Sequence, residues 1–116
     1  GHPRTSGTYS KVLGRMVRDA GMLSLMDAIR KAALMPAQRL ESLAPAFKNK
    51  GRVSVGSDAD LVLFDPNRVI DRSTYQDATL SPEGIPHVLV NGVPVIKDSA
   101  VIEGVLPGKG IRAPNA

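Results

Sequence analysis

The stretch GRVSVGSDADLVLFD, residues 51–65, decides the fold of the second half of this chain. Within it, Leu61-Val-Leu-Phe64 is a continuous apolar run with Asp60 before it and Asp65-Pro66 after it. A run this short, closed by turn-forming residues, favours a buried strand over a helix. We therefore predict a buried strand at residues 61–64.

A second β signal follows at VLVNGVPVI, residues 88–96. Asn91-Gly92 separates two apolar runs, and this pair strongly favours the type I′ turn of a two-residue hairpin. Pro94 has no N–H, so its strand should lie at an edge or turn that position to solvent. Residues 66–86 contain several Pro and Gly residues, which indicate a long connection without regular structure. For residues 107–116 we predict a mostly irregular tail.

The first 45 residues have a helical pattern instead. Residues 9–20 place apolar side chains on one helical face, and Gly21 can adopt the left-handed conformation of a helix C-cap. Ser24 can cap the next helix, with Asp27 as a shortened capping-box partner. Pro36 should stop that helix or begin a new one at its first turn, leading to a short helix over residues 36–43. The chain therefore divides near residue 45 into a helical and a β part, which is the α+β class.

Composition excludes several kinds of site. The chain has 116 residues, which suits one domain, and it contains no cysteine, so neither a disulfide nor a thiolate metal site can form. No apolar run approaches the 18 or so residues of a membrane span, so we expect no membrane partner and a cytoplasmic location.

The net charge of +4 raises the question of a nucleic-acid partner. The basic residues are spread among apolar and acidic positions, and aromatic residues make up only 3% of the chain, which leaves no platform for stacking bases. We therefore expect solvated helical faces and no nucleic-acid binding.

Three or four strands do not easily close a sandwich or a barrel, and two amphipathic helices each leave an apolar face to be covered. The sequence therefore indicates that the chain packs on further protein. That protein could be the remainder of a longer chain, or a second copy in a homo-oligomer. A stand-alone structural or interaction module without catalysis is an alternative of a different class.

Three motifs in this order resemble the C-terminal end of a metal-dependent amidohydrolase. They are Pro36-Ala-Gln-Arg-Leu40, Lys50-Gly51 with Gly56-Ser-Asp-Ala-Asp-Leu-Val-Leu-Phe-Asp65, and Val88-Leu-Val-Asn-Gly92. The resemblance implies that residues 1–45 are the last helices of a (β/α)8 barrel and that residues 46–116 are the C-terminal half of a small β-sandwich with its tail. Dihydroorotases and hydantoinases share these motifs, so a fragment of such an enzyme is an alternative.

The run His2-Pro-Arg-Thr-Ser-Gly-Thr-Tyr9 is similar to a segment of the D-aminoacylase, or N-acyl-D-amino-acid deacylase, group. This resemblance implies hydrolysis of the amide bond of small N-acyl-D-amino acids. It also implies that Arg4 binds the substrate carboxylate, a role that suits the planar fork of a guanidinium group.

The resemblance further implies zinc in the intact enzyme. The zinc ligands of the group (a His-x-His pair, a bridging Cys or modified Lys, two further His and an Asp) lie upstream of this segment. Zinc catalysis needs about three protein ligands, whereas this chain has only His2 and His87. We therefore expect no metal ligand and no catalytic residue here, an inactive isolated chain, and the N-terminal remainder of the enzyme as its partner.

For two further pairs of residues, structural roles are favoured over catalytic ones. His2 is expected to be a loop residue, and His87, beside Pro86 at the start of a strand, to be structural. Asp58 and Asp60 could suggest paired carboxylates for acid–base chemistry. They flank a turn into a strand, so turn and edge roles are favoured.

Overall fold

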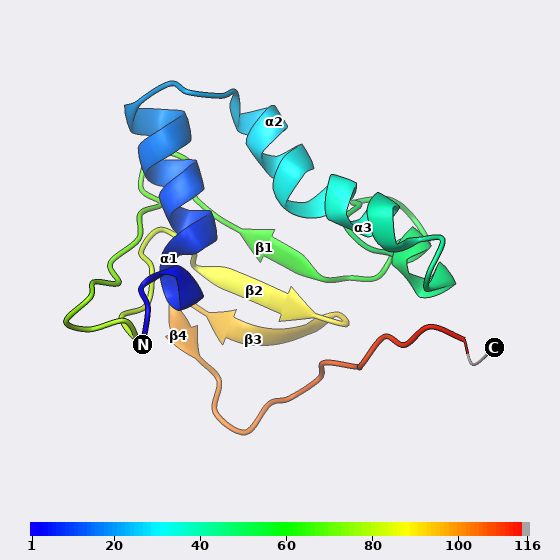
Figure 1. The fold of residues 1–116 in the computed structure, drawn as a ribbon. Helices are drawn as coiled ribbons and strands as arrows, with labels where there is room; N and C mark the ends of the chain where they lie inside the picture. Colours follow the sequence, from blue (N-terminus) through cyan, green and yellow to red (C-terminus); the bar gives the residue numbers. More distant parts are fainter. Residues whose placement is uncertain (115–116) are drawn as a thin grey trace.

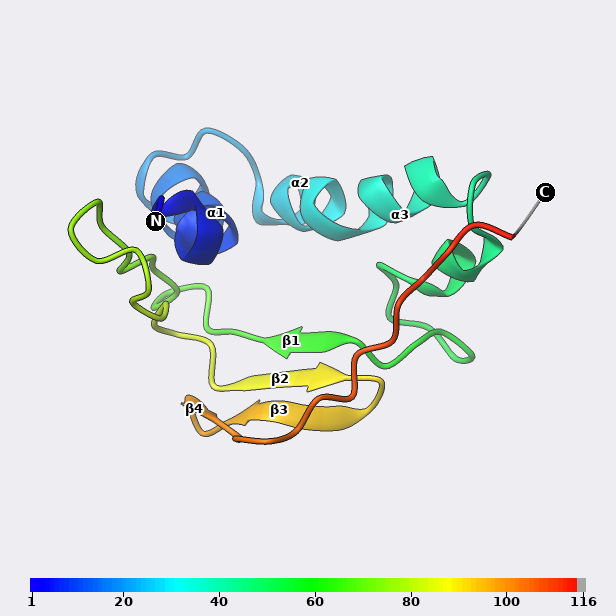
Figure 2. The same ribbon diagram turned by 60° about the horizontal axis from the view of Figure 1, so that its bottom comes forward.

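In the computed structural model, which describes residues 1–114, a layer of helices lies over one antiparallel sheet (Figures 1 and 2). The first helix joins α1 (Arg4–Lys11) to the π-helical segment η1 (Val12–Asp19) without a break, because the residues at the junction keep helical φ and ψ angles. The second joins α2 (Leu25–Ile29), η2 (Arg30–Leu34) and α3 (Met35–Leu40). A short 3₁₀ helix, η3 (Pro45–Asn49), then leads toward the sheet.

The first helix begins at Arg4, well before the predicted start at residue 9. Residues 4–8 carry no apolar periodicity, and the buried residues of α1 are Gly7 and Ser10. Polar contacts and close backbone packing hold this turn in place, so a search for hydrophobic periodicity could not detect it.

The predicted caps are confirmed. Gly21 has a φ of 59° after the first helix, and the Ser24 hydroxyl accepts a hydrogen bond of 3.1 Å from the backbone N–H of Asp27. Pro36 does not stop the second helix, so that half of the prediction is wrong. Pro36 lies in the first turn of α3. The residue before it, Met35, donates its N–H to the carbonyl of Arg30, five residues back.

The sheet consists of β1 (Leu61–Leu63), β2 (His87–Val90), β3 (Val93–Lys97) and β4 (Ala100–Val101), in that order, with every pair antiparallel. Asn91 and Gly92 have φ angles of 49° and 76°, which confirms the type I′ hairpin. The sequence did not predict the outer strand β4. This strand pairs with β3 only at Ile96 and Lys97, so Pro94 has no partner residue in β4.

The prediction of a buried first strand is wrong for this chain. Val62 and Leu63 are 56% and 48% exposed to solvent. An apolar hollow of about 450 Å³ lies between the helix layer and the sheet, with Leu13 and Ala33 on one side and Phe64 and Val88 on the other. Among residues 1–114, the buried hydrophobic residues are one valine, Val69, and three alanines, so the part of the chain that the structure describes has a small core.

No helix within residues 1–114 combines the length and the apolar character needed to cross a membrane.

Val69 is fully buried in the connection between β1 and β2, and this connection lies against the first helix (Figure 1). At Gly14 the backbones come so close that a Cβ would collide with the carbonyl oxygen of Val69 and lie 3.0 Å from Ile70 Cδ1. The lack of space for a Cβ therefore requires glycine here. The backbone conformation does not, because the φ angle of Gly14 is outside the left-handed region.

We expect Gly14→Ala to lower the free energy of unfolding of the chain by about 1–3 kcal/mol, because the collision is with backbone that has to move. Urea unfolding at equilibrium measures the change. Gly108→Ala is the matched control, since a Cβ there meets no atom within 4 Å. Alanine is intrinsically favoured in helices by about 1 kcal/mol, so a Gly14→Ala variant that is more stable than the parent by about that amount would contradict the close approach.

Candidate functional site

The first turn of α1 and the connection after β1 together enclose a polar hollow of about 410 Å³. Arg4 lies on this hollow, where α1 begins. The other lining residues come from the same helix and from the connection: His2, Pro3, Gly7, Thr8 and Lys11, and Asp71, Ser73, Thr74, Tyr75 and Gln76. The hollow therefore presents two basic side chains, Arg4 and Lys11, to whatever enters it.

Arg4 is held through its backbone, and no described residue of the chain binds its guanidinium. Its N–H donates to His2 Nδ1 at 3.1 Å, and its carbonyl accepts from the Thr8 hydroxyl at 2.7 Å. Within residues 1–114 the Arg4 side chain makes no hydrogen bond or ion pair. A free guanidinium beside a polar hollow can hold a carboxylate through two parallel N–H donors.

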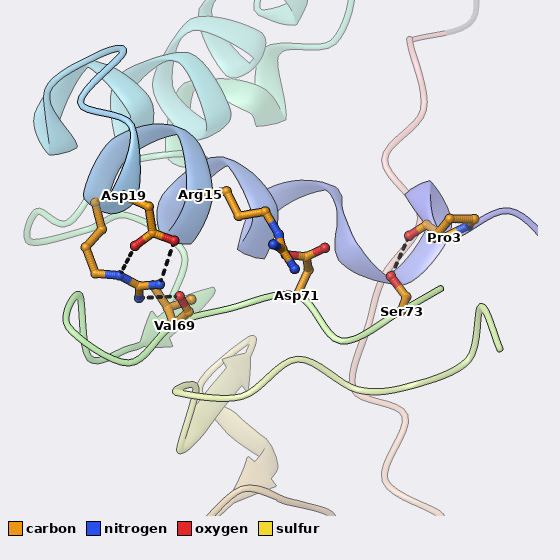
Figure 3. A network of polar contacts seen from close by, with 7 residues as sticks. Pro3, Arg15, Asp19, Val69, Asp71 and Ser73 are labelled. Carbon is orange, nitrogen blue, oxygen red and sulfur yellow. Dashed lines mark hydrogen bonds and ion pairs between the residues drawn. The ribbon is translucent and has the colours of Figure 1, made fainter. Parts of the chain in front are cut away.

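The connection that forms the far wall of the hollow is fixed to the first helix by polar contacts (Figure 3). Arg15 Nε lies 2.7 Å from Asp71 Oδ1, and the Asp71 side chain is only 12% exposed. Arg18 donates to the carbonyl of Val69 at 2.7 Å, and its Nε donates to Asp19 at the same distance. The Arg18 guanidinium holds the pKa of the Asp19 carboxyl below its usual value.

Sequence reasoning missed this wall. It treated residues 66–86 as a connection broken by Pro and Gly, and found no function for Asp71, Ser73 or Tyr75. No local pattern marks these residues, because their partners, Arg15, Pro3 and His2, lie more than 50 positions away in the chain.

Asp58 and Asp60 have the turn role that the sequence favoured. Both pair with the ammonium group of Lys50, at 2.9 and 2.5 Å. Asp60 also accepts the backbone N–H of Asn91 at 2.8 Å, and this bond, together with the pairing to Lys50, lowers the pKa of Asp60. These residues join the start of β1 to the hairpin turn, and they lie outside the polar hollow.

The two histidines do not form a metal centre. His2 packs edge-on against Tyr75, with ring centroids 5.2 Å apart. His87 begins β2, where its Nδ1 accepts the N–H of Asp98 at 3.4 Å, in agreement with a structural role. Within residues 1–114 no group of three or more His, Cys, Asp or Glu side chains could hold a metal ion, so the described residues do not fit a zinc site.

Several known proteins similar to this chain are N-acyl-D-amino-acid deacylases or D-aminoacylases. The N-acyl-D-glutamate deacylase of Alcaligenes xylosoxydans xylosoxydans is 47% identical over 81% of the chain. A solved D-aminoacylase, studied for its binuclear metal centre, superposes with a TM-score of 0.85 over 96% of the chain at 35% identity. The N-acyl-D-glutamate deacylase of Bordetella bronchiseptica, solved with zinc and a phosphonate inhibitor, does so with a TM-score of 0.74 over 81% at 40% identity.

These similarities cover only part of each relative. The chain spans 18% of the Alcaligenes deacylase and 22% of the D-aminoacylase structure. D-Hydantoinases match less closely, at 28% and 31% identity. No protein-family model matches the chain.

The helical layer, the hairpin motif and the structural neighbours place the chain among the amidohydrolases. Within them it belongs to the D-aminoacylase and N-acyl-D-amino-acid deacylase family, which confirms the resemblance found in the sequence.

Asp60 makes the stability of the chain depend on pH in the acid range. A carboxyl whose pKa is lower in the folded than in the unfolded state stabilises the fold above its unfolded pKa of about 3.9, and this contribution is lost as the pH falls through the folded pKa. We expect Asp60→Asn to destabilise the chain by about 1 kcal/mol or less near neutral pH, because the Lys50 pair is partly exposed.

Urea unfolding at a series of pH values tests this expectation. The difference between the parent and Asp60→Asn should shrink as the pH falls below about 4. Glu103→Gln, at an exposed position outside every ion pair of residues 1–114, is the control and should track the parent. A difference between parent and Asp60→Asn that stays constant from neutral pH to strong acid would contradict the argument.

Proposed function

We propose that this chain is the C-terminal segment of a zinc-dependent amidohydrolase that hydrolyses the amide bond of N-acyl-D-amino acids. The observation that carries the proposal is the match of nearly the whole chain, in sequence and in structure, to D-aminoacylases and N-acyl-D-glutamate deacylases. The lower identity to D-hydantoinases favours this group over the alternative.

In the proposed enzyme, residues 1–45 are the last helices of the (β/α)8 barrel. Residues 46–116 are the C-terminal part of the small β-sandwich. The exposed faces support this division, since Val62, Leu63 and Met26 present apolar surface that a single-layer sheet and two helices leave uncovered. The remainder of the enzyme is then the partner that covers them.

Zinc belongs to that remainder in this proposal. When bound, it supplies the Lewis-acid and water-activating chemistry of such hydrolases. Residues 1–114 provide no ligand set for it, so the contribution that we assign to this segment is to binding and to stability.

Arg4 is the residue that we assign to the substrate. It would hold the carboxylate of the N-acyl-D-amino acid in the polar hollow by a bidentate, charge-assisted pair. Its free guanidinium, its place on the hollow and the nearby positive charge of Lys11 support the assignment. Such a pair orients the substrate and moves no proton, because arginine stays charged.

In the full-length enzyme, we expect Arg4→Ala to raise KM for an N-acetyl-D-amino acid by about 10- to 100-fold with kcat little changed, since a charge-assisted pair is lost from the bound substrate. N-acetyl-D-leucine and N-acetyl-D-glutamate serve as substrates, and the α-carboxamide of whichever is hydrolysed serves as the probe that lacks the α-carboxylate. KM for the carboxamide should change little.

Arg39→Ala is the matched control, because Arg39 is an exposed arginine in α3 away from the polar hollow. Equal effects of Arg4→Ala on the acid and on the carboxamide would contradict carboxylate binding.

The segment assignment predicts that the native product is several times heavier than the 12.3 kDa of this chain. It also predicts that the isolated chain has no zinc-dependent hydrolase activity. Immunodetection in the source cell and assay of the purified chain with added zinc check the two statements. A native product near 12.3 kDa, or turnover by the pure chain, would overturn the assignment.

A further inference from the structure

The carbonyl of Pro3, directly before Arg4, is held from outside the helix. The Ser73 hydroxyl donates to it at 2.8 Å, across 70 positions of sequence. The same carbonyl accepts the first helical N–H, from Gly7, at 2.9 Å. Ser73 therefore binds the Pro3 carbonyl, which is the start of the helix that carries Arg4 (Figure 3).

A second bond runs in the opposite direction. The Ser6 hydroxyl of α1 donates to the carbonyl of Ala78 at 2.5 Å. At Gly7, in the same helix, a Cβ would collide with the Ser73 hydroxyl and lie 3.2 Å from the Cβ of Asp71. The first turn of α1 and residues 71–78 thus meet through two hydrogen bonds and through close packing of side chains against Gly7.

Residues 71–78 are themselves fixed in place. At one end, Asp71 pairs with Arg15 and is nearly buried. Further along, Thr74 and Asp77 close a turn, in which the Thr74 N–H donates to the Asp77 carbonyl at 2.8 Å and the Asp77 N–H donates to the Thr74 hydroxyl at 2.9 Å. A segment anchored in this way is a firm support, not a loop that follows the helix.

None of these contacts touches the Arg4 guanidinium. They set the position of its backbone, and so the place from which the planar fork reaches into the hollow. Productive binding of a carboxylate by such a fork is sensitive to displacements of about 1 Å.

We propose that residues 71–78 are a positioning element for Arg4 and that Ser73 is its main positioning residue, acting through the Pro3 carbonyl on the binding of the substrate carboxylate. This inference rests on the function proposed above. It makes the connection after β1, which belongs to the β part of the chain, a determinant of substrate affinity.

A double-mutant cycle in the full-length enzyme tests it. Ser73→Ala should raise KM for the N-acetyl-D-amino acid by about fivefold, the value of one ordinary hydrogen bond, with kcat within about twofold of the parent. KM for the α-carboxamide should not change. In the Arg4→Ala background, Ser73→Ala should have no further effect, because the group that it positions is absent.

Two further variants complete the design. Ser6→Ala loosens the same contact from the helix side and should repeat the pattern, so the test does not depend on the folding of one variant. Ser81→Ala removes an exposed hydroxyl from the same connection and should leave both substrates unaffected, since Ser81 makes no side-chain hydrogen bond within residues 1–114.

The outcomes separate this inference from the proposed function. If Arg4→Ala leaves the acid and the carboxamide equally affected, the carboxylate role of Arg4 fails, and the inference fails with it. If Arg4→Ala acts on the acid alone while Ser73→Ala and Ser6→Ala do nothing, only the inference fails. A Ser73→Ala effect that is equal on both substrates, or that persists in the Arg4→Ala background, shows general damage to the fold and also overturns it.

Discussion

The Arg15–Asp71 ion pair and the buried Val69 beside it are the contacts on which the rest of the structure depends. They hold the connection after β1 against the first helix, where Gly14 lets the two backbones approach closely and Gly7 makes room for the side chains of Asp71 and Ser73. Asp71 is nearly buried while Arg15 is about half exposed, so removing Arg15 would leave the Asp71 carboxylate without its partner, and this contact is costly to lose. The described part of the core is otherwise small, and the fold therefore relies on polar contacts between distant segments.

A second set of polar contacts secures the sheet. Lys50 holds Asp58 and Asp60, and Asp60 in turn holds the turn of the hairpin through the N–H of Asn91. The Asn91 side chain also donates to the carbonyl of Pro107, which fastens the start of the tail. Two of the motifs that gave the resemblance in the sequence, at residues 50–65 and 88–92, are thus in direct contact in the structure. Their residues serve to connect strands and turns and need not perform chemistry.

These two sets of contacts show what this segment would contribute to the proposed enzyme. The helix presents Arg4 at the polar hollow, and the β part supplies the wall that fixes the start of that helix. The apolar hollow and the exposed faces of β1 and α2 are the surfaces left for the rest of the protein. In the proposed enzyme, binding, support and assembly would therefore occupy different faces of the same chain.

The elements that form from local interactions were readable in the sequence: the Asn91-Gly92 hairpin, the Gly21 and Ser24 caps and the strand at residues 61–63. Turn geometry and capping depend on neighbouring residues, so they can be read from short patterns. The early start of α1 and the wall at residues 71–78 were not readable. They depend on partners many positions away, such as Ser73 with Pro3 and Asp71 with Arg15, and such pairs exist only once the chain has folded.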